Sequence, residues 1–308
     1  MREFPRPRIV VSRCIEFDHC RYDGSMIASD LVKALKPYVD YIPICPEMEM
    51  GLGAPRETIR IVAAEGSIRL IQPATGLDLT EKMSRFTRGF LSSLPQVDGF
   101  ILKFRSPSCG LKDIRVYSGA ERPRPVSKAP GFFGGAVMQS FSHLAVEDEG
   151  RLRNFNIREH FLTKLYALAS FRQARSEGEL SPLIRFHEAN KLLLSSHSQK
   201  ETKMLGNILA NRGGLSYNDL SELYREHLTL ALARPSRSSS LANVFMHALG
   251  YFKGDLTARQ KELFLENIQR YKSKKLPSRA LLAMLQSWAE GFGQDNLVNQ
   301  SIFQPFPE

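Results

Sequence analysis

Short runs of β-branched and other apolar residues alternate with helix-compatible segments through the first half of the chain. The strand-like runs lie at residues 8–12, 39–45, 68–72 and 99–104, and the helical segments between them lie at residues 25–35 and 80–94. This alternation is typical of a parallel sheet that is covered by helices. We therefore expect an α/β fold with a parallel sheet in the N-terminal half.

The second half of the chain contains no convincing strand. Apolar residues there recur near the helical period in segments that glycines and prolines separate. These predicted helices span residues 157–175, 183–195, 201–211, 217–233, 241–251, 258–272 and 279–290. A polar, charged stretch at residues 143–156 precedes them. The sequence thus predicts an α/β domain over residues 1–150 and an all-α domain over residues 151–308, each long enough for its own core.

Charge is divided unequally between these two parts. The chain has 42 Lys and Arg against 32 Asp and Glu, a net charge of +10. Residues 1–150 hold 20 basic and 18 acidic side chains, whereas residues 151–308 hold 22 and 14. A surplus of +8 in the helical part is typical of a surface that meets a polyanion, although solvated side chains are the alternative. The candidate nucleic-acid contacts are Lys103, Arg105, Lys191, Lys253, Lys274 and Lys275.

The start of the chain and its apolar runs bear on its location. No apolar run approaches the roughly 20 residues that span a bilayer. The charged, proline-containing start MREFPRPRIVVS lacks the apolar stretch of a signal peptide. We therefore expect a cytoplasmic protein with no membrane partner, and its oligomeric state is left open. Thiols stay reduced in that compartment, so the four cysteines are expected to be free, metal-bound or catalytic.

All four cysteines lie in the first half, and three of them follow predicted strands. Cys14 comes two residues after the first strand, Cys45 closes the second, and Cys109 follows the fourth. Loops from neighbouring parallel strands converge at the carboxyl edge of a sheet, so these three cysteines can meet in space. There they can bind a cofactor, whereas the alternative is three inert buried thiols.

The spacing of the cysteines favours one kind of metal centre. No CxxC pair occurs, which argues against a structural zinc site. Three isolated thiolates suit a 4Fe-4S cluster better, because one iron then stays open to a soft sulfur ligand. Cys20, six residues after Cys14, is the competitor for that iron, and its ligation would close the open position.

The cysteine neighbourhoods resemble those of the thiouracil desulfurase family. The matching runs are SRC at 12–14, CRYDG at 20–24, CPE at 45–47, GLGAPR at 51–56, LKFRSPSCG at 102–110 and a Gly-rich turn, GFFGG, at 131–135. The helical half is similar to a second, formerly uncharacterised domain through FHEANKLLLSSHS at 186–198, NVFMHALGYFK at 243–253 and QPFP at 304–307. The fusion of the two resembles the bacterial tRNA 4-thiouridine desulfidases.

The resemblance implies non-redox removal of sulfur from a thiolated pyrimidine, here 4-thiouridine in tRNA, with release of sulfide. It implies that Cys14, Cys45 and Cys109 hold a 4Fe-4S cluster. The open iron then binds the thiocarbonyl sulfur as a Lewis acid while water attacks the carbon. At Cys20 other residues are often found in the family, which argues against a ligand role. The segment 15–19 departs from the family pattern, which puts the shape of that loop in question.

The resemblance also assigns two catalytic residues. Glu47, two residues after the second cysteine, is the general acid or base, and Ser108, beside the third, is the other catalytic residue, with Ser106 as the nearby alternative. Glu47 can instead cap the helix that follows Pro46, and Ser108 can simply hydrogen-bond a thiolate.

Two other functions stay open on the sequence. One is desulfuration of free thiouracil or another small thio-compound, and the other is a non-catalytic iron-sulfur sensor that binds nucleic acid. Activity on the free base alone would favour the first, whereas function that survives Glu47→Ala would favour the second.

Overall fold

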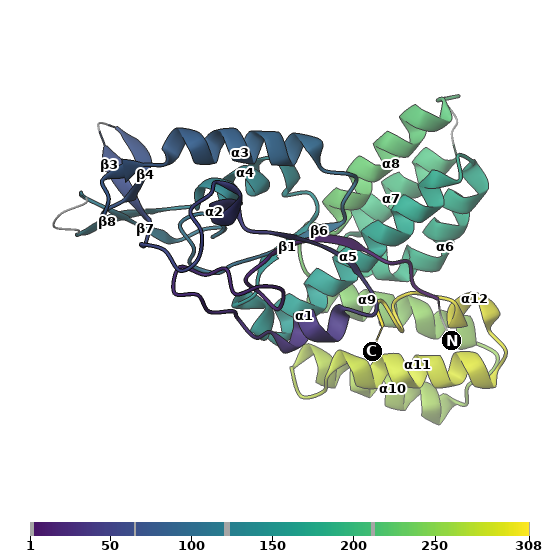
Figure 1. Ribbon diagram of the computed structural model, residues 1–308. Coiled ribbons are helices and arrows are strands. Elements are labelled where there is room, and N and C mark those ends of the chain that lie inside the picture. Colours follow the sequence, from purple (N-terminus) through teal and green to yellow (C-terminus); the bar gives the residue numbers. More distant parts are fainter. Residues whose placement is uncertain (1–2, 65, 120–123, 211–212, 308) are drawn as a thin grey trace. The chain divides into compact units, whose positions relative to one another are not determined.

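The computed structural model describes residues 3–64, 66–119, 124–210 and 213–307 (Figure 1). The chain divides into two compact units, Arg6–Leu165 and Met1–Pro5 with Tyr166–Glu308. The division falls inside one long helix, α5 (Phe155–Ser176). The first unit contains the sheets, and the second is built from helices.

A parallel sheet of four strands lies in the first unit, in the order β2-β1-β6-β9. Its strands are β1 (Arg8–Ser12), β2 (Asp40–Ile44), β6 (Gly99–Leu102) and β9 (Ala145–Asp148). Every residue of β6 is buried, as expected of a central parallel strand. The prediction of a parallel α/β sheet is confirmed. The polar stretch 143–156 contributes β9 to this sheet, beside β6.

A second sheet of five strands, in the order β5-β4-β3-β7-β8, is not apparent in the apolar pattern. Its strands are β3 (Arg60–Ala64), β4 (Ser67–Gln72), β5 (Leu77–Asp78), β7 (Ile114–Tyr117) and β8 (Pro125–Ala129). β3 pairs with β7 in parallel, and the other described pairs are antiparallel. The predicted strand at 68–72 therefore belongs to this mixed sheet and not to the parallel one.

Before α5, the described helices of the first unit are α1 (Asp30–Leu35), α2 (Pro46–Glu49), α3 (Thr80–Ser93) and α4 (Phe132–Phe141). Side chains of α3 and α4 pack onto the parallel sheet. Phe90 of α3 and Phe133 of α4 have ring centroids 5.9 Å apart, and both side chains pack in the core beside Phe100 of β6. Helix α1 begins later than the predicted 25–35 because Ser29 accepts a hydrogen bond from the Val32 N–H (3.4 Å) and caps it.

The described residues of the second unit form helices joined by turns and loops, with no strand among them, which confirms the all-α prediction. Its core includes Phe245, Phe252 and Phe264. The predicted helix 201–211 ends at Leu209, and residue 211 lies outside the described residues. After α5, the helices are α6 (Leu180–His197), α7 (Gln199–Leu209), α8 (Tyr217–Ala231), α9 (Ser238–Leu249), α10 (Ala258–Lys272), α11 (Ser278–Gly291) and α12 (Asp295–Val298).

None of the helices in the described ranges combines the length and apolarity that a membrane span requires.

Candidate functional site

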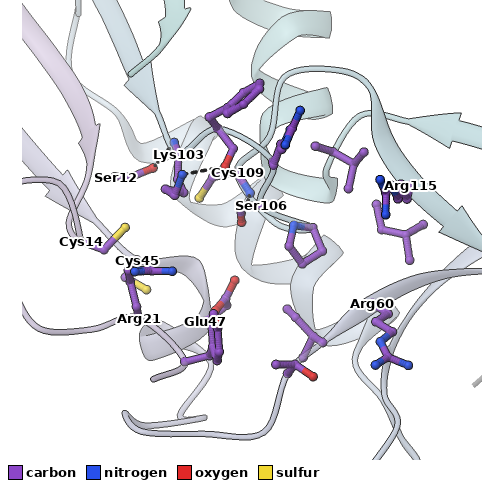
Figure 2. Close-up of a pocket in the computed structure, with 18 of the residues that line it drawn as sticks. Ser12, Cys14, Arg21, Cys45, Glu47, Arg60, Lys103, Ser106, Cys109 and Arg115 are labelled. Atoms are coloured by element: carbon purple, nitrogen blue, oxygen red, sulfur yellow. Dashed lines mark hydrogen bonds between the residues drawn. The ribbon is translucent and has the colours of Figure 1, made fainter. Parts of the chain in front are cut away.

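A cavity of about 940 Å³ lies in the first unit, at the carboxyl ends of β1, β2 and β6 (Figure 2). The loops that follow these three strands form part of its lining, and residues of β3, β7 and β8 form another part. This is the edge at which parallel α/β sheets bind their ligands. The volume is near the upper end of the usual range for small-molecule sites, about 300–1,000 Å³.

Three cysteines from three separate loops line this cavity. Cys14 follows β1, and Cys109 lies in the loop after β6. Cys45 directly follows β2 and is the N-cap residue of α2. Each is at most 8% exposed, and none is in a disulfide. Figure 2 shows them on one side of the cavity. The structure therefore brings together the three candidate ligands that are far apart in sequence.

Cys20 joins the same group of thiols. It is 1% exposed, and its carbonyl oxygen lies 3.9 Å from Sγ of Cys45. A hydrogen bond with the Cys14 side chain, together with burial, raises the pKa of Cys20 to about 11. The hydrogen bond with Cys20, together with burial, raises the pKa of Cys45 far above its ordinary value, and burial does the same for Cys109. Thiols in such surroundings ionise when a positive charge, such as a metal, is supplied.

The cysteine thiols are the donor type that an iron-sulfur cluster takes. Within the described ranges, no three His, Cys, Asp or Glu side chains are grouped closely enough to hold one metal ion. The irons of a 4Fe-4S cluster occupy different corners, so its thiolate ligands stand further apart than the ligands of one ion. Buried, unbridged thiols from three loops around a common cavity match that requirement.

Glu47 lies in the first turn of α2 and faces the same cavity. One carboxylate oxygen accepts a hydrogen bond from Ser108 Oγ (2.7 Å), and the other is paired with the Arg56 guanidinium. Ser108 is fully buried, and the Arg56 side chain is only 5% exposed. Glu47 therefore does not act as a helix cap: its carboxylate is fixed in one orientation by charge-assisted bonds on both oxygens.

Arg56 is a site residue whose role the sequence leaves undecided. Besides Glu47, it donates hydrogen bonds to the carbonyls of Cys20 (3.0 Å) and Gly53 (2.7 Å). Arg56 therefore connects the loop that carries Cys20 to Glu47, the candidate general acid or base. The only sequence signal for this role is its place at the end of the GLGAPR run.

The loop that carries Ser108 and Cys109 is held by the start of α4. The N–H groups of Phe133 and Gly134 both donate to the Ser108 carbonyl (2.9 and 3.0 Å), so the loop satisfies donors that a helix N-terminus leaves free. The segment 131–135, predicted as a Gly-rich turn, is therefore the first turn of a helix. Gly131 and Gly134 are explained by the close approach of the backbone at residues 107–110.

Replacing Gly134 by alanine is expected to destabilise the protein and displace the third cysteine. The new Cβ would lie 2.4 Å from the Gly110 carbonyl oxygen and 2.5 Å from that of Cys109, so one backbone must move. Overpacking of this kind costs about 1–3 kcal/mol, which urea unfolding measures. Gly89→Ala on α3 is the control, since no atom lies within 4 Å of its added Cβ. Equal unfolding free energies for the two variants would contradict the close packing.

The remaining candidates are distributed over both units. Lys103 and Arg105 line the cavity, and Lys103 is paired with the buried Glu149 (2.5 Å). Ser106 Oγ accepts the Cys109 N–H (3.0 Å) and so shapes the loop. The other candidate contacts are exposed side chains of the second unit, Lys191, Lys253, Lys274 and Lys275.

Known proteins resemble the two parts of the chain separately. Residues 9–149 match the family 2-thiouracil desulfurase, and residues 191–307 match DUF1722, a family of unknown function. The uncharacterized protein YbbK of Bacillus subtilis (strain 168) is 34% identical over 109 residues, which are 33% of this chain and 72% of YbbK. The uncharacterized protein YbgA of Escherichia coli (strain K12) is 24% identical over 148 residues, 47% of this chain and 88% of YbgA.

Among solved structures, the [4Fe-4S]-dependent thiouracil desulfidase TudS is 28% identical, with a TM-score of 0.37. The match covers 48% of this chain and 94% of that one.

Proposed function

This chain belongs, through residues 9–149, to the 2-thiouracil desulfurase family, and we propose that it removes the sulfur of 4-thiouridine in tRNA, leaving uridine and sulfide. One observation carries the proposal: buried cysteines from three loops share a cavity with Glu47 and Arg56, and the Glu47 carboxylate is bonded to both Arg56 and the buried Ser108. Family membership supports the class of reaction, and the cavity holds groups suited to it.

Cys14, Cys45 and Cys109 are the residues that would hold a 4Fe-4S cluster. When bound, such a cluster supplies an iron without a protein ligand, a soft Lewis acid for a thiocarbonyl sulfur. Cys20 remains a free thiol beside these ligands in this proposal. Its loop is instead anchored through its carbonyl, which accepts a hydrogen bond from Arg56 (3.0 Å).

Glu47 is the acid–base group of the proposed reaction. Water adds its oxygen to carbon 4 of the pyrimidine, and the carbon–sulfur bond breaks as the carbonyl forms. Glu47 takes one proton from that water and returns it to the departing sulfur, and the second proton of the water is released as the carbonyl forms. One water is therefore consumed and one hydrogen sulfide, as HS⁻ and a proton, is formed without oxidation or reduction. Ser108 and Arg56 keep the carboxylate oriented toward the cavity throughout.

Charge supports RNA as the carrier of the thiolated base. Residues 151–308 have 22 basic and 14 acidic side chains, and the candidate lysines there are exposed. A base can reach a cavity of this kind only when it is turned out of its stack. The proposal places the protein in the cytoplasm, where such tRNA and reduced thiols occur together.

The substrate is tested by comparing thiolated tRNA with free 4-thiouracil, using anaerobically reconstituted full-length protein. Sulfide release and loss of 4-thiouridine from nuclease-digested tRNA are measured together. We expect one sulfide for each 4-thiouridine lost. Activity on free 4-thiouracil alone would overturn tRNA as the substrate and indicate a small-molecule desulfurase. Binding of tRNA without sulfide release from either compound would indicate a non-catalytic sensor.

A further inference from the structure

The cavity is more basic than its proposed chemistry requires. Its lining includes eight Lys and Arg residues but only two Asp and Glu. Figure 2 shows Arg60 and Arg115 at the end of the cavity away from Cys14 and Cys45. These two arginines belong to the mixed sheet and not to the loops that carry the cysteines. The cavity therefore has a cysteine end and a basic wall.

Several basic residues of the cavity already have carboxylate partners, and these lie in loops. The pairs are Arg21 with Asp23, Arg56 with Glu47 and Lys103 with Glu149. The other five basic residues of the lining are Arg105 and Lys112, in the loop between β6 and β7, and Arg60, Arg115 and Lys128, on the mixed sheet. The mixed sheet therefore carries the larger share of the positive charge that is still available to a ligand.

Arg60, Arg115 and Lys128 form a row across three neighbouring strands, β3, β7 and β8. Arg115 pairs directly with Lys128 in the antiparallel ladder. Arg60 precedes Ile61, whose partner on β7 is Val116. Val116 is buried, so strand alternation turns Arg115 to the opposite face. Like charges directly opposite one another destabilise a sheet, and a bound anion would offset that cost.

The described carboxylates offset little of the charge of this row. Lys128 lies 3.9 Å from Asp113, and both side chains are more than 60% exposed. An exposed pair of this kind contributes little to stability and leaves the lysine available to a ligand. Neither Arg60 nor Arg115 has an ion pair within the residues that the structure describes.

An aromatic ring accompanies the row. Tyr117 follows Arg115 by two residues on β7 and so shares its face. Its ring centroid is 5.8 Å from the Arg60 guanidinium carbon. Arginines that can grip phosphate oxygens with paired donors, next to a ring on which a base can stack, are the groups that single-stranded nucleic acid requires.

We propose that Arg60, Arg115 and Lys128 bind successive phosphates of the RNA strand whose thiolated nucleotide enters the cavity. Neighbouring strands lie about 4.8 Å apart, so the row spans about 10 Å, which is wider than a single phosphate group. The inference rests on the proposed function and deepens it: the first unit itself selects a phosphate-bearing substrate, independently of the lysines in the helical unit.

The test compares the full-length variant Arg60→Gln/Arg115→Gln with Arg85→Gln/Arg88→Gln. The control removes the same charge from two exposed positions on α3 that do not line the cavity. Binding of fluorescently labelled, unmodified tRNA is measured by anisotropy at increasing KCl, which requires no cluster and no turnover. The second measurement is kcat/KM for thiolated tRNA and for 4-thiouridine 5′-monophosphate, each divided by kcat/KM for the nucleoside 4-thiouridine.

For the row variant, we expect the slope of log affinity against log salt to become shallower by about one for each lost phosphate contact. The kcat/KM ratio of thiolated tRNA to nucleoside should fall about tenfold or more, as expected for lost charge-assisted bonds. The α3 control should keep both wild-type values. Arg60→Lys/Arg115→Lys retains the charge and should keep most of the slope, which separates lost contacts from misfolding.

A salt slope and a kcat/KM ratio equal to those of the control would overturn the phosphate row while leaving tRNA desulfuration intact. Loss of the monophosphate preference with an unchanged tRNA slope would also overturn it, in favour of a single phosphate. A shallower slope in the row variant, when wild-type protein desulfurates only the free base, would support the row and reject tRNA as the substrate.

Discussion

Glu47→Gln is expected to lower the turnover of thiolated tRNA by about 10²–10⁴-fold, the usual contribution of a positioned acid or base. The amide keeps the shape of the side chain and can still accept from Ser108, but it cannot take a proton from water. The iron and sulfide content of the protein should stay at the wild-type value, because Glu47 is not among the proposed ligands. Sulfide release and cluster absorbance, measured on the same preparation, distinguish a loss of acid–base catalysis from a loss of the cluster.

The same short helix provides the control for this variant. Glu49 is the other acidic residue in the first turn of α2, but it pairs with Arg13 and does not line the cavity. Glu49→Gln removes the same charge from the same helix and should keep wild-type turnover. If Glu47→Gln also kept more than half of that turnover, Glu47 would not be the acid–base group.

Serine in place of Cys14, Cys45 or Cys109 is expected to abolish both the cluster and desulfuration. Each of these thiols comes from a different loop. The one remaining cysteine, Cys20, therefore cannot take the position of each of the three. A serine hydroxyl is a harder and far less acidic ligand than a thiolate, which makes it a poor partner for iron in a cluster. Iron and acid-labile sulfide per chain, with the visible absorbance of the cluster, are the measurements.

Folding must be monitored in the same three variants. Replacing a buried thiol by a hydroxyl changes the side-chain volume little, so far-UV circular dichroism should match that of the wild-type protein. A variant that is folded and empty supports the ligand assignment. Full iron content in any one of the three would remove that cysteine from the ligand set.

The parallel sheet could be predicted because its two central strands, β1 and β6, are almost entirely buried. β1 is an apolar run whose bounds coincide with the predicted 8–12, and β6 is buried throughout. The mixed sheet could not be predicted in the same way. Four of the five residues of β8 are exposed, so its sequence PVSKA has no apolar period, and its pairing with β7 gives it its structure.

Some residues of the candidate site could be predicted from the sequence, and others could not. The cysteines could be placed from sequence because each follows a recognisable strand, and strand ends of a parallel sheet meet at one edge. The roles of Arg56, Arg60 and Arg115 depend on contacts that the local sequence does not encode. Arg56 reaches Glu47 across a turn, and Arg115 meets Lys128 through the register of two strands.

Iron and acid-labile sulfide per chain in Cys20→Ser, after anaerobic reconstitution, test the central claim that three cysteines hold the cluster and leave one iron open. Cys20 is buried beside Cys14 and Cys45, so it is the residue that can close that position. We expect about four iron and four sulfide per chain, as in the wild-type protein, with desulfuration of thiolated tRNA retained. Loss of the cluster together with loss of activity would contradict the three-ligand site.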